Sequence, residues 1–140
     1  MEMSHEAIAD FLQQKRVGVL GINRKNAPPQ LVPVWYLYDD EAIWIMSEKE
    51  VPKVGNIRRD PRVTLCVDDK ILPYKGVVIY GTVTLTEDNI HERRRAIAQR
   101  YLGESEGEAY AAQPRPRGKI LLKLVPERTY SWDRGLADRR

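Results

Sequence analysis

A hydroxyl and an amine six residues apart are the side chains of this sequence best suited to hold an anion. Ser47 follows the apolar run 42–46, and Lys53 opens the segment KVGNIRR, which has the composition of one or two helical turns. A helix N-terminus presents free backbone N–H groups and the positive end of a dipole, and a lysine adds a full charge. Asn56 and Arg58 follow one turn later. The spacing is compatible with a phosphate site, although a solvated helix face is the commoner outcome for such a run of charges.

Other reaction chemistries have few candidate residues. His5 and His91 are the only histidines and stand far apart, and no cluster of His, Cys, Asp and Glu has ligand spacing, so we predict no metal site. The single cysteine, Cys66, lies within an apolar run, where a buried, inert thiol is expected. One cysteine also excludes internal disulfides and favours a reducing compartment. No nucleophile–base triad and no glycine-rich phosphate loop is present.

Length and charge narrow the class of protein. The 140 residues predict one domain spanning 1–140, and the 23 basic and 20 acidic residues are mixed, giving a net charge of +3. This balance suits a small anionic ligand and does not indicate nucleic-acid binding. No run approaches the roughly 18 apolar residues of a membrane span, and the start of the chain lacks a signal-peptide pattern. We therefore expect a cytoplasmic protein with no membrane partner.

The segment 31–69 positions the candidate anion site. We expect a strand over 31–38, a turn at 39–41, a strand over 42–46, a short helix over 53–59 and a strand over 63–67. Asp60-Pro61 ends the helix, because the residue before a proline is disfavoured in the α region. Pro33 cannot donate a hydrogen bond and indicates an edge strand or a bulge.

The remaining elements alternate strands with marginal helices. The N-terminal helix runs from Glu6 to Arg16 with Ser4 as its cap. We then expect a strand over 17–22, a turn over 23–28, a loop over 68–76, a strand over 77–85 with a bulge at Gly81, and a helix capped by Asp88 that ends near 102. Segment 103–118 is predicted as an irregular surface loop, and 120–125 as a strand extended weakly through 129–132; Leu136 begins a charged tail. The fold class is mainly β, a closed antiparallel sheet with flanking helices.

Several of these residues occur together in one known family. The chain resembles the pyridoxamine 5'-phosphate oxidase-like family of split β-barrels, which bind flavins and deazaflavins. The residues that carry the resemblance are Pro29-Gln30-Leu31, Trp35 to Asp39, Ser47, Lys53, and Asn56 to Val63. The likeness extends to Ser131-Trp132-Asp133. It implies a split barrel built as a homodimer, with the cofactor at the subunit interface.

The resemblance also implies roles for individual residues. Ser47 and Lys53 match the positions that hold the cofactor phosphate, with Asn56 and Arg58 nearby. The flavin ring would lie over the strand Gln30-Leu31-Val32-Pro33. Lys75 falls where the oxidase uses a basic residue, and Trp132 would cover the cofactor of the other subunit.

The chain departs from the family pattern at two places. Val51 and Pro52 stand where relatives carry an arginine before the lysine, which weakens the phosphate site unless Lys49, Arg58 or Lys75 compensates. Gly76 replaces a glutamine of the oxidase proper, which argues against oxidation of pyridoxamine phosphate.

The resemblance leaves cofactor and activity open between alternatives. FMN is favoured, because few charged contacts are available; the alternative is the deazaflavin coenzyme F-420, whose longer anionic tail would follow a basic surface (Lys49, Lys53, Arg58, Arg59, Lys75). We expect an oxidoreductase that passes a hydride through the cofactor to a small organic substrate. A protein that binds flavin or haem without turnover, or one that has lost its cofactor, is the alternative. Tyr36 and Tyr38 are the candidates for proton donation.

The number of large aromatic residues gives separate support for a dimer. Six such residues (Trp35, Tyr36, Trp44, Tyr74, Tyr80 and Trp132) exceed what the interior of a small barrel holds. We expect some of them to line an interface or the cofactor.

Overall fold

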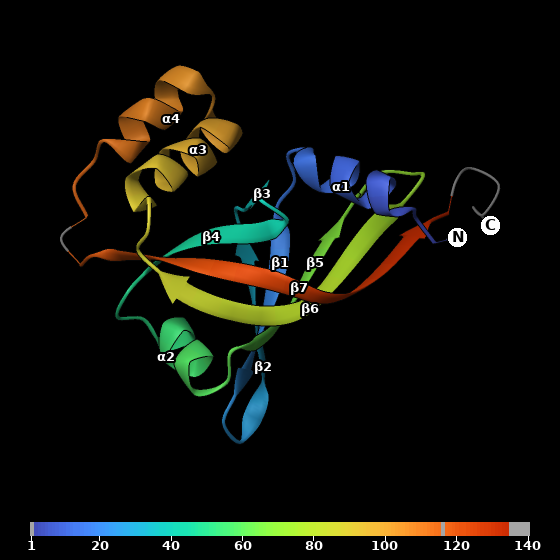
Figure 1. Cartoon of the computed structure of the whole chain (residues 1–140), viewed down its shortest axis with the longest axis horizontal. Helices are drawn as coiled ribbons and strands as arrows, with labels where there is room; N and C mark the ends of the chain where they lie inside the picture. Colours follow the sequence, from blue (N-terminus) through green and yellow to red (C-terminus); the bar gives the residue numbers. More distant parts are fainter. Residues whose placement is uncertain (1, 116, 135–140) are drawn as a thin grey trace.

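The chain forms one seven-stranded antiparallel sheet with four helices at its margins (Figure 1). The computed structural model describes residues 2–115 and 117–134, so the predicted tail from Leu136 onward lies outside the described residues. The elements in chain order are α1 (His5–Gln13), β1 (Gly18–Arg24), β2 (Ala27–Val34), β3 (Leu37–Asp39), β4 (Ala42–Glu48), α2 (Pro52–Arg59), β5 (Arg62–Asp68), β6 (Lys75–Thr86), α3 (Ile90–Leu102), α4 (Glu104–Ala111) and β7 (Lys119–Asp133).

The strands follow the order β2-β1-β5-β6-β7-β4-β3, with β6 and β7 as a long curved ribbon through the middle (Figure 1). The β6–β7 register shifts between Tyr80 and Gly81, which confirms the predicted bulge. A side chain at Gly81 would collide with the carbonyl group of Val125, so the close approach of the two strands requires glycine. Pro33 lies in β2 at the end of this strand order, which confirms the expected edge position.

One large hydrophobic core joins two helices to most strands of the sheet, and a smaller cluster of Ala42, Trp44 and Leu121 lies apart from it. Buried side chains from α1, α2 and the strands β1, β4, β5, β6 and β7 form one cluster, with Tyr36 wholly buried among them. Apolar residues alternate along β5, where Val63, Leu65 and Val67 are buried and the residues between them are partly exposed. This period of two places one face of the coiled sheet inward, and α1 packs over it.

The predicted strand 31–38 is wrong, because the chain leaves the sheet at Trp35 and Tyr36. Val34 ends β2, which pairs with β1, and Leu37 begins β3, which pairs with β4. The backbone N–H of Tyr36 donates to the Tyr101 hydroxyl at 3.0 Å, and its own hydroxyl donates to the carbonyl of Leu12. A side chain from α3 therefore replaces the ladder hydrogen bond at this point.

The predicted irregular loop 103–118 is also wrong, because eight of its residues form α4. Gly103 adopts a φ of +89° and turns the chain between α3 and α4. Gly107 then packs against the backbone of Gln99, where any side chain would collide. Helix α4 is polar and weakly amphipathic in sequence, so this close contact with α3 holds it in place.

The helix ends agree with most of the sequence signals. Ser4 caps α1 by accepting from the N–H of Ala7, and Asp60 ends α2 before Pro61. Helix α3 begins one residue later than predicted, since Asn89 rather than Asp88 is the N-cap. None of the described helices has the length and apolar character needed to cross a bilayer.

Candidate functional site

Lys53 borders a pocket of about 280 Å³ between the sheet and the helices α3 and α4, here called the Lys53 pocket. Its walls come from the end of β2, the middle of β4, the first turn of α2, one face of α3, and the start of β7. The lining residues are Pro33, Val34, Trp35, Ile45, Met46, Lys53, Arg94, Ile97, Ala98, Tyr110, Arg115 and Lys119. Four of these residues are cationic, and the others are apolar or aromatic.

Trp35 forms the aromatic wall of the Lys53 pocket and is held rigidly. Its indole stacks on Tyr101, with ring centroids 4.9 Å apart and planes 5° from parallel. The Tyr101 hydroxyl donates to the carbonyl of Arg16 at 2.6 Å while it accepts from Tyr36. These bonds anchor the tyrosine between α3 and the sheet, and the stacked indole faces the pocket from this anchored ring.

Four cations converge on this pocket from separate elements. Lys53 and Lys119 are half-buried, Arg94 is buried, and Arg115 is partly buried. Burial lowers the pKa of Lys53, and burial together with Arg115 lowers the pKa of Lys119. Glu48 opposes both shifts, and its carboxylate lies 4.0 Å from Lys119 Nζ. The charge balance therefore favours binding of an anion at this pocket.

Arg94 connects α3 to the end of α4. Its Nη2 donates to the backbone carbonyls of Tyr110 at 3.2 Å and Gln113 at 3.0 Å. Its Nε is buried and has no partner among the described residues. Burial and the nearby Arg115 lower the pKa of Arg94. The side chain thus orders the segment after α4 and keeps positive charge between that segment and β4.

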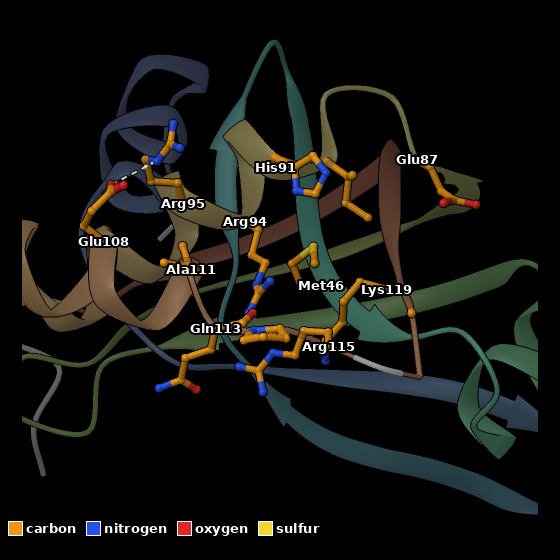
Figure 2. Close-up of a pocket in the computed structure, with 14 residues that line it drawn as sticks. Met46, Glu87, His91, Arg94, Arg95, Glu108, Ala111, Gln113, Arg115 and Lys119 are labelled. Atoms are coloured by element: carbon orange, nitrogen blue, oxygen red, sulfur yellow. Dashed lines mark hydrogen bonds and ion pairs between the residues drawn. The ribbon is translucent and has the colours of Figure 1, made fainter.

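A second pocket of about 560 Å³ adjoins the first, and Figure 2 shows its lining. It lies between α3, α4 and the segment that leads into β7, and is called the α3–α4 pocket. Met46, Arg94, Arg115 and Lys119 line both pockets, so they form a shared wall.

The structure brings only some of the predicted site residues to the Lys53 pocket. Lys53 and Pro33 line it directly. Ser47 is buried in β4, and its hydroxyl donates to the carbonyl of Glu48 at 3.0 Å. Three others (Gln30, Leu31 and Val32) lie along β2, with Leu31 69% exposed on this edge strand.

The remaining predicted residues lie away from this pocket. Asn56 accepts a hydrogen bond from Arg59 at 2.7 Å, and Arg58 is exposed on α2. Lys75 pairs with Asp133 at 3.7 Å at the far end of the β6–β7 ribbon, beside Trp132. Lys49, considered as a substitute for the missing arginine, pairs with Glu87 at 2.8 Å.

The two candidate proton donors do not line the Lys53 pocket. Desolvation by burial raises the pKa of Tyr36 to about 12, and its hydroxyl bonds to Leu12 inside the core. Tyr38 lines a different pocket, beside α1. Cys66 is half-buried, and burial raises the pKa of its thiol. Within 2–115 and 117–134, no group of three or more His, Cys, Asp and Glu residues is placed to hold a metal.

Three site residues were missed by sequence reasoning: Arg94, Arg115 and Lys119. Arg94 has a signal that could have revealed it, because it lies four residues after Ile90 and three before Ile97, on the apolar stripe of α3. Arg115 and Lys119 have no such pattern, since their positions follow from the packing of α4.

The comparisons with known proteins agree on one family. The family model of pyridoxamine 5'-phosphate oxidase matches residues 4–133. A crystal structure of a conserved hypothetical protein from Mycobacterium tuberculosis is 30% identical with a TM-score of 0.82, covering 94% of this chain and 85% of that chain. No curated protein matches the chain.

Two further solved structures have the same fold. A protein of Listeria innocua named as a pyridoxamine 5'-phosphate oxidase is 25% identical with a TM-score of 0.70, covering 90% of this chain and 95% of that chain. An F420 reductase is 21% identical with a TM-score of 0.70, covering 86% and 93%, and at this identity the likeness concerns the fold alone. The match over residues 4–133 and the seven-stranded antiparallel sheet show that this chain, a split β-barrel, belongs to the pyridoxamine 5'-phosphate oxidase family.

Proposed function

We propose that the chain is an oxidoreductase that binds FMN, with the cofactor phosphate in the Lys53 pocket. The observation that carries this proposal is the convergence of four cations on a pocket whose remaining lining is apolar or aromatic. A phosphate would offset the charge of Lys53, Lys119 and Arg115 through charge-assisted hydrogen bonds. Burial lowers the pKa of both lysines, so an anion would stabilise their charged forms.

The apolar part of the pocket suits a flat ring. Pro33 and Val34 end β2 beside Trp35, and this part of the chain offers backbone groups together with an aromatic wall. A bound flavin supplies hydride transfer. The residues of the chain would orient it and exclude water. Tyr36 and Tyr38 do not line this pocket, so the proposal assigns them no part in proton transfer.

A deazaflavin coenzyme is a second candidate cofactor. Sequence reasoning favoured FMN because few charged contacts were expected, yet the pocket gathers Arg94, Arg115 and Lys119 in addition to Lys53. Four cations exceed what one phosphate monoester requires, and a longer anionic tail would engage more of them. The F420 reductase of similar fold is in keeping with this alternative.

The site is proposed to be completed by a second copy of the chain. Leu31 on β2 and Tyr130 on β7 are 69% and 60% exposed, which is unusual for large apolar side chains in a sheet. Trp132 lies beside Tyr130, with ring centroids 5.9 Å apart. A partner chain covering these residues would bring Trp132 near the cofactor of the other subunit.

Titration of the cofactor-free protein with FMN and with the deazaflavin coenzyme at matched salt tests this proposal. We expect saturable FMN binding followed by flavin reduction and substrate turnover when a reduced nicotinamide is supplied. Deazaflavin binding tighter by tenfold, about 1.4 kcal/mol, would assign the site to that cofactor instead. Binding of FMN without any turnover would indicate a carrier, and binding of neither would contradict the proposal.

A further inference from the structure

The α3–α4 pocket has twice the volume of the Lys53 pocket, about 560 Å³ against 280 Å³. Figure 2 shows His91 at one side of it and Arg115 and Lys119 on the opposite side, with Arg94 reaching between them. The shared wall of Met46, Arg94, Arg115 and Lys119 separates the two pockets. A phosphate bound beside Lys53 would therefore not fill the larger one.

The carboxylates that line the α3–α4 pocket are already paired. Glu87 binds Lys49 at 2.8 Å, and Glu108 binds Arg95 at 2.9 Å. Within the described part of the chain, no carboxylate lies within ion-pair distance of Arg94 or Arg115. The pocket therefore carries positive charge that the described carboxylates do not neutralise.

Arg94 carries this charge into the protein. It is 9% exposed, and its guanidinium meets two backbone carbonyls, which are dipoles and not counterions. Its buried Nε has no partner among residues 2–115 and 117–134. A desolvated cation without a counterion is costly, and a bound anion is the usual compensation.

The rest of the lining indicates what the anion is attached to. Met46, Ile90, Ala111 and Pro114 give the pocket an apolar side, and His91 stands three residues before Arg94 on the same face of α3. We propose that the α3–α4 pocket is a second anion site, which binds an organic phosphate or carboxylate with its charge at Arg94 and Arg115 and its apolar body against Met46 and Ile90.

Phenyl phosphate is a suitable probe, with phenol as the uncharged comparison. The chain has only two histidines, so the ring signals of His91 and His5 can be assigned by NMR with one variant. We expect phenyl phosphate to shift the His91 signal in a saturable manner and to leave the His5 signal unchanged. Phenol should shift neither signal at the same concentration.

A negative charge introduced at the rim separates this pocket from the Lys53 pocket. His91→Glu places a carboxylate on the exposed start of α3, and calorimetry should show phenyl phosphate binding at least tenfold weaker. His5→Glu makes the same change on α1 and should leave the affinity within twofold. Equal affinities in the two variants, no shift of His91, or loss of binding in Lys53→Ala but not in His91→Glu would overturn the proposal.

Two competition experiments show whether the anion belongs to a cofactor or to a separate ligand. If protein saturated with FMN still binds phenyl phosphate, the pocket takes a ligand separate from that cofactor, such as a substrate. If the deazaflavin coenzyme displaces phenyl phosphate and FMN does not, the pocket takes the tail of the longer cofactor. Both results support an anion site, whereas displacement by FMN itself overturns it. Phenyl phosphate binding without flavin binding would instead contradict only the proposed cofactor.

Discussion

The indole of Trp132 lies directly over Gly76, its partner in the β6–β7 register. A Cβ built at Gly76 would collide with three atoms of the six-membered ring edge and ring junction of the indole. The two residues are therefore coupled: this indole position requires glycine across the ladder. A side chain at position 76, where the resemblance to the oxidase implies a glutamine, is therefore incompatible with this placement of Trp132.

Gly76→Ala should destabilise the protein by about 1–3 kcal/mol, because the new methyl group forces Trp132 out of its position. Urea unfolding measures this loss. Trp132→Ala in the same chain should recover part of it, since the collision then disappears. Gly55→Ala is the matched control, because a Cβ there meets nothing within 4 Å and α2 gains helix propensity. Equal effects at positions 76 and 55 would contradict the coupling.

Lys53→Ala should weaken FMN binding by about 1–3 kcal/mol, the cost of losing a charge-assisted contact in the pocket. Fluorescence titration of FMN measures the affinity. Arg58→Ala removes a cation from the same helix at an exposed position outside the pocket, and should change the affinity much less. The melting temperature of the cofactor-free Lys53→Ala protein should barely move. Equal losses of FMN affinity in the two variants would contradict a specific contact of Lys53 with the cofactor and would show only a general effect of positive charge.

Tyr36 should make the free energy of unfolding fall with rising pH above about pH 10. A tyrosine in the unfolded chain ionises near pH 10, whereas desolvation raises the pKa of Tyr36 to about 12 in the folded chain. Between these values the unfolded state has lost a proton that the folded state keeps, so stability falls by up to about 3 kcal/mol. Tyr36→Phe should lack this component, and parallel unfolding curves of the two proteins from pH 9 to 12 would contradict the prediction.

The chain should be a homodimer at micromolar concentration. Sedimentation equilibrium is expected to give twice the chain mass of 16.2 kDa. Tyr130→Glu introduces charge at an exposed aromatic position of β7 and should shift the protein toward monomer. A wild-type monomer would remove the basis for placing Trp132 beside the cofactor of a partner subunit.

The strand pattern and the short helix could be predicted from sequence because their signals are local. Val63, Leu65 and Val67 alternate with partly exposed residues, and Asp60-Pro61 ends α2 as the conformational restriction before proline requires. Gly81 indicated the bulge because a glycine inside a strand is a local signal of this irregularity. Lys53 was also found at the start of its helix, and it borders the pocket.

The basic lining of that pocket depends on contacts between distant segments. In sequence, Arg93-Arg94-Arg95 is a charge run on a helix. In the structure, Arg93 lies over Trp44 at 3.4 Å, Arg94 enters the wall between two pockets, and Arg95 pairs with Glu108. Because a helix has 3.6 residues per turn, three adjacent side chains point in three directions. The contacts that each arginine makes therefore depend on what packs against its face of the helix.

Helix α4 is the clearest example of an element that depends on tertiary contacts more than on its local sequence. Its sequence, ESEGEAYA, is polar and contains a glycine, so local propensity gives little reason for a helix. The helix is held in the structure because Gly107 packs against the backbone of Gln99, and Arg94 donates to the carbonyl of Tyr110 in its last turn and to that of Gln113 beyond it. The sequence by itself determined the sheet, the short helix and Lys53, whose signals are local or periodic. Only the tertiary structure decided which cations surround the pocket. The contact between α3 and α4 depends on the packing of two segments, and the local sequence of either segment does not predict it.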